Sequence, residues 1–286
     1  MKPTFDIVTI VGAGLLGGSL GLALKANGQA GVVRGVGRRQ ETLETAKAQG
    51  AIDEAHLDLR VAVKDADLIV VCTPVLQTIA QLEEMTGEIS PNAVVTDVAS
   101  TKAAVCSAVR AAWPKPYRFI GSHPMAGSEK FGPEHARADL YDGKVVVVTP
   151  TESDDPGARK TIYHLWESLG ADVVEMDARV HDGLVARTSH VPHIVAACLS
   201  QLAAAAGDDA SPVAGSGFRD MTRVAEGRPE LWRDICLTNV DGISEALRDL
   251  ENQLSVFRTW LEDRADEDVE VFFQAGRDAR AQVLHE

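Results

Sequence analysis

The chain of 286 residues has few cysteines, little basic charge and no motif typical of a metal site. Its four cysteines are far apart and lack the paired spacing of zinc sites or disulfide frameworks, so we expect buried thiols in a reducing cytoplasm. Lysine and arginine number 28 against 42 acidic residues, which gives a net charge of −14. This balance, with no basic tract along the chain, argues against nucleic acid as a partner.

An uninterrupted membrane-length apolar helix is also missing. The segment from Ile7 to Leu24 comes closest, because it has almost no polar groups and lies near the N-terminus, as a signal sequence would. Its glycines would weaken a membrane helix, and Asp6 does not suit a cationic leader. A strand, a turn and a helix fit this segment better, and we expect no membrane association.

The first 25 residues contain a dinucleotide-binding fingerprint. Phe5 to Val11 is a β-branched run typical of a strand, and Leu15 to Lys25 is an apolar helix. Between them, Gly12 allows a tight turn, Gly14 lets the backbone approach a pyrophosphate, and Gly17 lets the helix pack on the strand. The amides at the start of the helix would hold the phosphates. The predicted cofactor-binding residues here are Gly12, Gly14, Leu15, Leu16 and Gly17.

Apolar strands and helix-like segments then alternate. This alternation predicts an α/β fold with a Rossmann-type, doubly wound, mostly parallel sheet in a cofactor domain covering residues 1–176. Thr73 and Pro74 end one strand in a polar loop, which lines the adenosine side of the crevice or is a simple turn. The further expected strands are Val32–Val36, Leu68–Cys72, Ala93–Asp97, Phe119–Gly121 and Val145–Thr149.

The acidic residue that binds the ribose in NAD-specific folds is absent. Gly37 occupies the expected position, and Arg38 and Arg39 follow it. A guanidinium can pair with a 2′-phosphate, which a carboxylate would repel, so the pair predicts a preference for NADP, with NAD still possible. The alternative is that both arginines are solvated surface charges.

The strand pattern disappears near Asp177, and residues 177–286 are predicted to form an all-α domain. Ala178 to Ala206 should form a long helix that Pro192 kinks near His190, because proline cannot donate to the carbonyl of Thr188. A second helical stretch should cover Pro229 to His285. The apolar stretch from Ile194 to Ala206 is more than one small domain can cover, which predicts a homodimer through this domain.

One histidine is a candidate general base. The run from Tyr117 to Gly121 is typical of a short strand, and Pro124 should stop further pairing while keeping His123 extended. Ligands of open α/β sheets bind outside the carboxyl ends of the strands, and imidazole titrates near neutral pH. His123 is therefore a base facing the cofactor, or a histidine that caps a turn.

The helical domain offers further polar groups. His181, His190 and His193 are close in sequence, but no His-Glu-x-x-His pattern is present, and we expect no metal. One of His190 and His193 could bind substrate while the other is a hydrogen-bonded helix histidine. Arg219 and Arg223 would share a helical face and suit a substrate with two carboxylates, or they form salt bridges between helices.

Together these segments resemble the prephenate and arogenate dehydrogenase family of tyrosine biosynthesis over nearly the whole chain. Five ordered blocks support the resemblance, and such a set is more specific than any one of them. The blocks are the fingerprint at Gly12, Asp97-Val98-Ala99-Ser100-Thr101-Lys102, the run from Gly121 to Glu129, His181-Asp182 followed by Ser189-His190-Val191-Pro192-His193, and the run from Gly217 to Arg223.

The resemblance implies an oxidative decarboxylation in which a ring hydride passes to nicotinamide and the ring carboxylate leaves as carbon dioxide. His123 would accept the proton of the C4 hydroxyl, and Ser100 would bond that hydroxyl or the nicotinamide and orient His123. Arg223 would bind a substrate carboxylate, and Glu129 would gate the entrance. The other residues that the resemblance implies at the substrate are Arg219, His190, His193 and Trp232.

Several alternatives stay open. The keto acid prephenate is preferred over arogenate, since the nearby acids Asp220 and Glu226 are flanked by arginines and no clear partner for an ammonium is present. Rival interpretations are another two-domain hydroxyacid dehydrogenase, an imine reductase, or an NADP-binding sensor without catalysis. We also expect no separate regulatory domain, while direct inhibition by tyrosine is left undecided.

Overall fold

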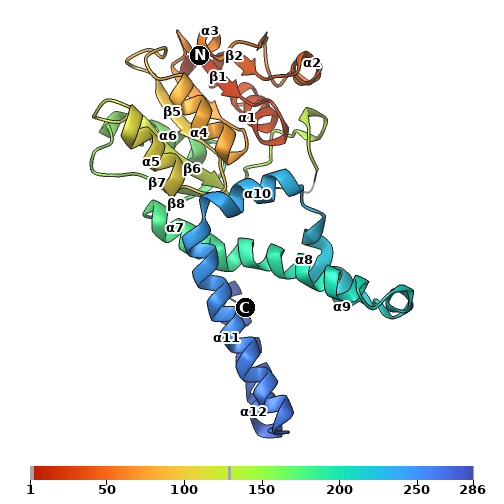
Figure 1. Cartoon of the computed structure of the whole chain (residues 1–286). Coiled ribbons are helices and arrows are strands. Elements are labelled where there is room, and N and C mark those ends of the chain that lie inside the picture. The colour runs from red at the N-terminus through yellow and green to blue at the C-terminus, as the bar shows by residue number, and fades with distance from the viewer. Residues whose placement is uncertain (1–2, 128–129, 286) are drawn as a thin grey trace.

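The computed structural model describes residues 3–127 and 130–285. The chain divides into a sheet half (residues 3–176) and a helical half (residues 177–285), with the helical half extending away from the sheet (Figure 1). The α/β class with a helical second part, expected from the sequence, is confirmed.

The described part of the sheet half contains β1 (Phe5–Val11), β2 (Ala30–Val36), β3 (Glu54–His56), β4 (Leu68–Val71), β5 (Val94–Asp97), β6 (Phe119–Pro124), β7 (Val145–Thr149) and β8 (Asp172–Glu175). These strands form one sheet in the order β3-β2-β1-β4-β5-β6-β7-β8. All neighbouring pairs are parallel except β6 with β7. β3 and β8 were not predicted, because both are short edge strands with mostly exposed or half-exposed side chains.

Strand β6 differs from its prediction. It continues beyond Gly121, and His123 and Pro124 pair with Val147 and Val146 of the antiparallel neighbour β7. Proline is tolerated because the pairing with β5 ends at Ile120, so the missing N–H of Pro124 faces no strand there. His123 therefore lies within the last two residues of a strand, beyond the end of β5.

Helices cover both faces of the sheet. They are α1 (Leu15–Ala26), α2 (Gln40–Ala48), α3 (Leu59–Val63), α4 (Val75–Glu84), α5 (Ala103–Ala112) and α6 (Pro156–Ser168). Adjacent strand residues point to opposite faces, and Ile10 and Val11 belong to two different buried apolar clusters. Helices α1, α2 and α6 pack into the cluster of Ile10, and α3, α4 and α5 into that of Val11.

The helical half contains α7 (Ala178–Val185), α8 (Val191–Ala204), α9 (Ser216–Thr222), α10 (Pro229–Thr238), α11 (Val240–Glu262) and α12 (Asp266–Leu284). A π-helical turn (Ala186–His190) joins α7 to α8, so the irregularity lies where Pro192 predicts it. Helices α11 and α12 form an antiparallel arm that projects from the rest of the chain (Figure 1). The buried apolar cluster of this half consists only of Ala186, Val191, Ile243 and Ala246 among the described residues.

The apolar surface is uneven. Among the four cysteines only Cys106 is buried and Cys72 and Cys236 are half-buried, so the expectation of four buried thiols was wrong for the other three. Cys198 on α8 is exposed, and Leu202 on the same helix is 72% exposed. The reason is that α8 has few neighbours within the chain to cover it. Within residues 3–127 and 130–285, no helix is long and apolar enough to cross a membrane.

Candidate active site

The glycine turn after β1 is shaped for close backbone approach. Gly12 has φ +98°, and a Cβ there would lie 2.8 Å from the carbonyl oxygen of Cys72. A Cβ at Gly17 would lie 2.2 Å from the carbonyl oxygen of Gly12, whereas one at Gly14 would meet only open space. Because Gly14 is also the N-cap of α1, the free amides of the helix start beside an open backbone that can approach a pyrophosphate.

A cleft of about 1670 Å³ extends from this turn along the carboxyl ends of β1, β2 and β4. It has room for an extended dinucleotide, and residues of α10 line its far side. Leu15 and Leu16 are half-buried instead, and Leu16 packs on the core while its carbonyl accepts a hydrogen bond from Tyr141. The predicted cofactor residues that line the cleft are Gly12, Gly14, Arg38, Arg39, Thr73 and Pro74.

The end of β2 has the chemistry expected from the sequence. Arg38 and Arg39 are exposed, Arg39 is the N-cap of α2, and both side chains face the cleft. Thr73 is held by hydrogen bonds of its hydroxyl to Thr78 and Gln81, so the loop after β4 is fixed against α4. The cleft is thus lined by the hydrogen-bonded loop at Thr73 and by the exposed guanidinium groups of Arg38 and Arg39.

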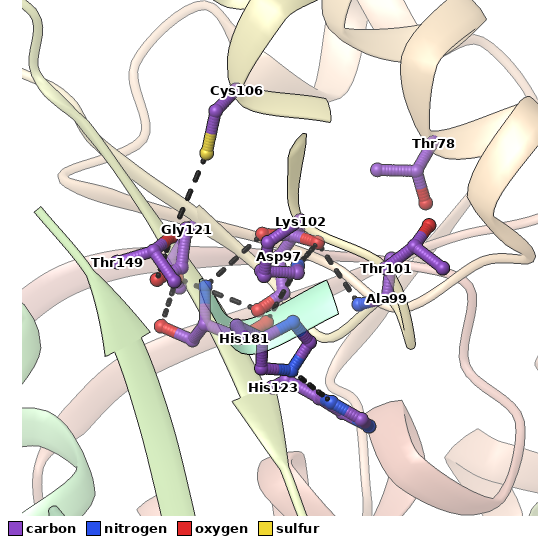
Figure 2. A network of polar contacts seen from close by, with 12 residues as sticks. Thr78, Asp97, Ala99, Thr101, Lys102, Cys106, Gly121, His123, Thr149 and His181 are labelled. Carbon is purple, nitrogen blue, oxygen red and sulfur yellow. Dashed lines mark hydrogen bonds and ion pairs between the residues drawn. The ribbon is translucent and has the colours of Figure 1, made fainter. Parts of the chain in front are cut away.

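His123 is held by a chain of hydrogen bonds. Its Nδ1 lies 2.8 Å from Nε2 of His181, and Nδ1 of His181 lies 2.8 Å from Oδ1 of Asp182. The two rings meet edge to face with centroids 5.0 Å apart, and Figure 2 shows His181 on its helix reaching across to His123 on β6. The partner that orients His123 in this structure is therefore His181 rather than Ser100.

The surroundings of His123 favour its neutral form. Burial lowers the pKa of His123 well below its ordinary value, and the His181 ring and the Lys102 ammonium act in the same direction. A neutral imidazole has one ring nitrogen without a proton, and that nitrogen can accept one. His123 is thus suited to act as a base at neutral pH.

A buried polar network lies next to the two histidines, above them in the view of Figure 2. Lys102 is fully buried, forms an ion pair with Asp97, and donates to the carbonyl oxygen of Ser122 at 2.7 Å. Asp97 in turn accepts from the amides of Ser122 and Ala99. These contacts fix the ends of β5 and β6 relative to each other. Ser100 follows β5 half-buried, and its hydroxyl makes no hydrogen bond to the described protein.

The helical half brings several predicted substrate residues together. His193 stacks on Trp232 with ring centroids 3.8 Å apart, and its Nδ1 donates to the carbonyl of Ser189 at 2.8 Å. Burial lowers the pKa of His193, and the Arg223 guanidinium adds to this effect, against the hydrogen bond to Ser189. Arg223 is therefore close to His193. It is exposed, so its charge is available to a ligand.

The remaining predicted residues differ in exposure. His190 is 1% exposed, accepts a hydrogen bond from Asn239, and burial lowers its pKa to about 4, as for a neutral hydrogen-bonded helix histidine. Arg219 on α9 is exposed and donates only to the carbonyl of Ala214 within the described chain. Glu129 lies outside the described residues. Among the described residues, no group of three or more His, Cys, Asp or Glu side chains is arranged to hold a metal ion.

Comparison with known proteins gives the family. Residues 20–175 match the family model described as "Prephenate dehydrogenase, nucleotide-binding domain", and residues 177–275 match "Prephenate dehydrogenase, dimerization domain". The chain belongs to the prephenate dehydrogenase family. A prephenate dehydrogenase of Bacillus subtilis is 34% identical over 285 residues, which cover 98% of this chain and 76% of that protein.

Solved structures of the prephenate dehydrogenase family agree with this assignment. The Aquifex aeolicus prephenate dehydrogenase in complex with hydroxyphenyl propionate and NAD⁺ superposes with a TM-score of 0.91 at 30% identity, covering 97% of this chain and 98% of that one. The Synechocystis arogenate dehydrogenase superposes with a TM-score of 0.83 at 33% identity, covering 97% and 99%. The family therefore includes members named for either substrate.

Sequence reasoning missed the role of four residues in this prephenate dehydrogenase family site. Asp97, Lys102, His181 and Asp182 lie within the blocks that carry the resemblance, but none of them was given a role in the site. The adjacent pair His181-Asp182 was the available signal, since a carboxylate beside an imidazole is a common way to orient a histidine base.

Proposed function

We propose that this chain catalyses the oxidative decarboxylation of prephenate to 4-hydroxyphenylpyruvate, with a nicotinamide cofactor as the hydride acceptor. The observation that carries the proposal is the hydrogen-bonded imidazole of His123 at the carboxyl edge of the sheet, and the lowered pKa of His123 agrees with it. A base at this position can take a proton from a substrate hydroxyl while the adjacent carbon is oxidised.

The residues present fit a dinucleotide. The open backbone at Gly14 and the start of α1 would hold the pyrophosphate, and the loop at Thr73 and Pro74 would contact the adenosine side. When bound, the nicotinamide supplies the hydride-accepting carbon.

The residues of this chain would move the proton and orient the substrate. His123 removes the proton of the C4 hydroxyl as the C4 hydride departs, which leaves a ring carbonyl. Loss of the ring carboxylate as carbon dioxide then gives a phenolate, and His123 returns the proton to that oxygen. Ser100 would bond the same oxygen. Arg223 would bind a substrate carboxylate, with Arg219, His193 and Trp232 around the substrate's side chain and His190 behind the His193–Trp232 stack.

NADP is the cofactor that we propose this chain prefers. Gly37 replaces the usual acidic residue, and the Arg38 and Arg39 guanidiniums face the cleft without a carboxylate partner among the described residues. NAD remains the second possibility, and the alternative role of both arginines is surface charge.

The substrate proposal favours a keto acid over an amino acid. The Arg223 guanidinium lowers the pKa of His193, and Arg219 precedes it by four residues, whereas Asp220 and Glu226 are exposed and lie in the same segment. This balance supports prephenate over arogenate.

We also propose that residues 1–176 bind cofactor and that residues 177–286 bind substrate and pair with a second copy. The family model over residues 177–275 is described as a dimerization domain, which supports a homodimer. The arm also exposes large apolar side chains, among them Val271 and Phe273, each 65% exposed. The cytoplasmic location stays a prediction.

The test is an assay of cofactor reduction in four mixtures, prephenate or arogenate with NAD⁺ or NADP⁺, with the products separated by chromatography. We expect the highest kcat/KM with prephenate and NADP⁺, and 4-hydroxyphenylpyruvate as product. A higher kcat/KM with arogenate, with tyrosine as the product, would show that arogenate is the substrate instead of prephenate. Absence of turnover in all four mixtures would refute the function.

A further inference from the structure

We propose that His181 and Asp182 are positioning residues that hold His123 as the tautomer with its proton on Nδ1, which leaves Nε2 free to accept the substrate proton. The inference deepens the proposed function and rests on it for the identity of the proton donor. The hydrogen-bond chain itself is a property of the protein without substrate.

The first group of the hydrogen-bond chain is the carboxylate of Asp182. Asp182 is 4% exposed, and its two oxygens accept from the backbone amides of Lys102 at 2.7 Å and Ala103 at 2.9 Å. These are the N-cap and first residue of α5, where the helix dipole favours a negative charge. A carboxylate held by two amides has no proton of its own to donate, so every hydrogen bond it makes must be given to it.

The carboxylate sets the tautomer of His181. Because Oδ1 of Asp182 accepts, Nδ1 of His181 must carry the proton of their 2.8 Å hydrogen bond. In the neutral ring, Nε2 of His181 then has a lone pair and accepts. His181 is 1% exposed, so water does not compete for this nitrogen.

His181 in turn sets the tautomer of His123. Since Nε2 of His181 accepts, Nδ1 of His123 must donate across the 2.8 Å contact, and Nε2 of His123 is left without a proton. In the reverse arrangement, His181 would be a buried cation donating to His123, and Nε2 of His123 would be protonated and unable to act as a base.

The charges around the pair oppose the reverse arrangement. His181, Lys102 and His190 each act to lower the pKa of His123, in addition to burial. The Lys102 charge is already paired with Asp97. A second buried cation here would lie beside this ammonium with only Asp182 to balance it, and unbalanced buried charge is strongly unfavourable.

The hydrogen bonds that join His123, His181 and Asp182 connect the two halves of the molecule. His123, Lys102 and Ala103 belong to the sheet half, whereas His181 and Asp182 lie at the start of the helical half. Asn239 donates to the carbonyl of Asp182 at 2.7 Å and so ties α11 to the same point. The orientation of the base thus depends on the docking of α7 against α5.

The first test is the tautomer of His123 in the full-length protein, measured by nitrogen-15 NMR of histidine-labelled chain, with the signal assigned by its loss in His123→Asn. We expect the Nδ1–H form at neutral pH. An Nε2–H form would overturn the proposal. This NMR measurement needs no substrate, so it separates failure of the positioning role from failure of the proposed function.

The second test compares two replacements of His181. His181→Gln retains an acceptor oxygen near the position of Nε2, whereas His181→Phe fills the space without one. We expect kcat with prephenate to fall about 10- to 100-fold in His181→Phe with KM little changed, and to recover largely in His181→Gln. His164→Phe, at an exposed histidine on α6, is the matched control and should keep wild-type kcat.

The outcomes are decisive in both directions. Equal loss in the Phe and Gln variants, or a wild-type kcat in His181→Phe, would overturn the positioning role. A His181→Phe chain that also loses the Nδ1–H signal of His123 while circular dichroism stays unchanged would support it, because a merely structural role would not change the tautomer of a folded protein.

Discussion

The sheet half and the helical half bury their apolar side chains to very different extents. Two extensive clusters fill both faces of the sheet, whereas the described helical half has a cluster of four buried residues and no buried residue in α12. Hydrophobic burial is the main favourable contribution to folding. Apolar burial within the described chain therefore favours the folded sheet half more than it favours the folded helical half.

Several buried ionisable side chains gather instead at the junction of the two halves. Lys102, Asp97, His181 and Asp182 are each at most 4% exposed, and all lie where the two halves meet. Such groups are tolerated only when fully paired, as they are here. The side chains that surround His123 therefore lie at the junction of the two halves, where the proposed chemistry would take place.

The largest expected effect is a loss of turnover when His123, at the junction of the two halves, is replaced. His123→Asn leaves the sheet half intact but removes the proton acceptor, so turnover should fall by about 10²–10⁴-fold. Cofactor affinity should be unchanged. Steady-state rates and a fluorescence titration with cofactor measure the two quantities. If cofactor binding were lost together with turnover, His123 would belong to the cofactor site instead.

The next effect tests the stability of the sheet half. Leu24 on α1 is fully buried, and Leu24→Ala should lower the free energy of unfolding by about 2–5 kcal/mol. Val61→Ala, at a side chain 53% exposed on α3, is the control and should change it by less than about 0.5 kcal/mol. Urea denaturation at two protein concentrations measures both. A similarly small loss of unfolding free energy in the two variants would contradict a tightly packed core around Leu24.

A third prediction concerns the covering of the helical half. Replacing Val271 and Phe273 of α12 with aspartate should weaken self-association at least about tenfold, since each buried apolar side chain contributes about 1.5–3 kcal/mol. Sedimentation at micromolar concentration should then report monomers where the parent chain reports dimers. Gln49→Asp adds an acidic residue in the sheet half and should leave the dimer intact. A parent chain that sediments as a monomer would refute this surface as an interface.

The smallest expected effect concerns cofactor choice. Arg38→Ala with Arg39→Ala should weaken NADP binding by about tenfold or more, because two charge-assisted hydrogen bonds are lost, and should leave NAD binding nearly unchanged. Isothermal titration with each cofactor measures the difference. Arg159→Ala is the control, because Arg159 lies on α6 and is ion-paired with Glu175 of β8. Equal weakening of both cofactors would show that the arginines are not selective.

The predictable parts of the molecule depend on local sequence. The fingerprint at Gly12, Gly14 and Gly17 could be predicted because its turn, its close approaches and its helix lie within a few residues. The doubly wound sheet followed from the alternation of apolar strands and helices. The missing N–H of Pro192 predicted a kink near His190, and the structure has a π-helical turn there.

The parts that were missed depend on contacts between distant segments. His123 and His181 are 58 residues apart, and nothing in the local pattern of either predicts their hydrogen bond. The continuation of β6 to Pro124 required its pairing with β7, and β3 and β8 form although their own sequences are short and polar. Edge strands of this kind are determined by their neighbour rather than by their own pattern.

The most direct test of the whole account is the stoichiometry of the reaction catalysed by the parent chain. With saturating prephenate and oxidised nicotinamide cofactor, we predict one carbon dioxide released for each cofactor reduced, measured together by trapped label from the ring carboxylate and by absorbance. Cofactor reduction without release of carbon dioxide, or no reduction at all, would contradict an oxidative decarboxylation with His123 as its base.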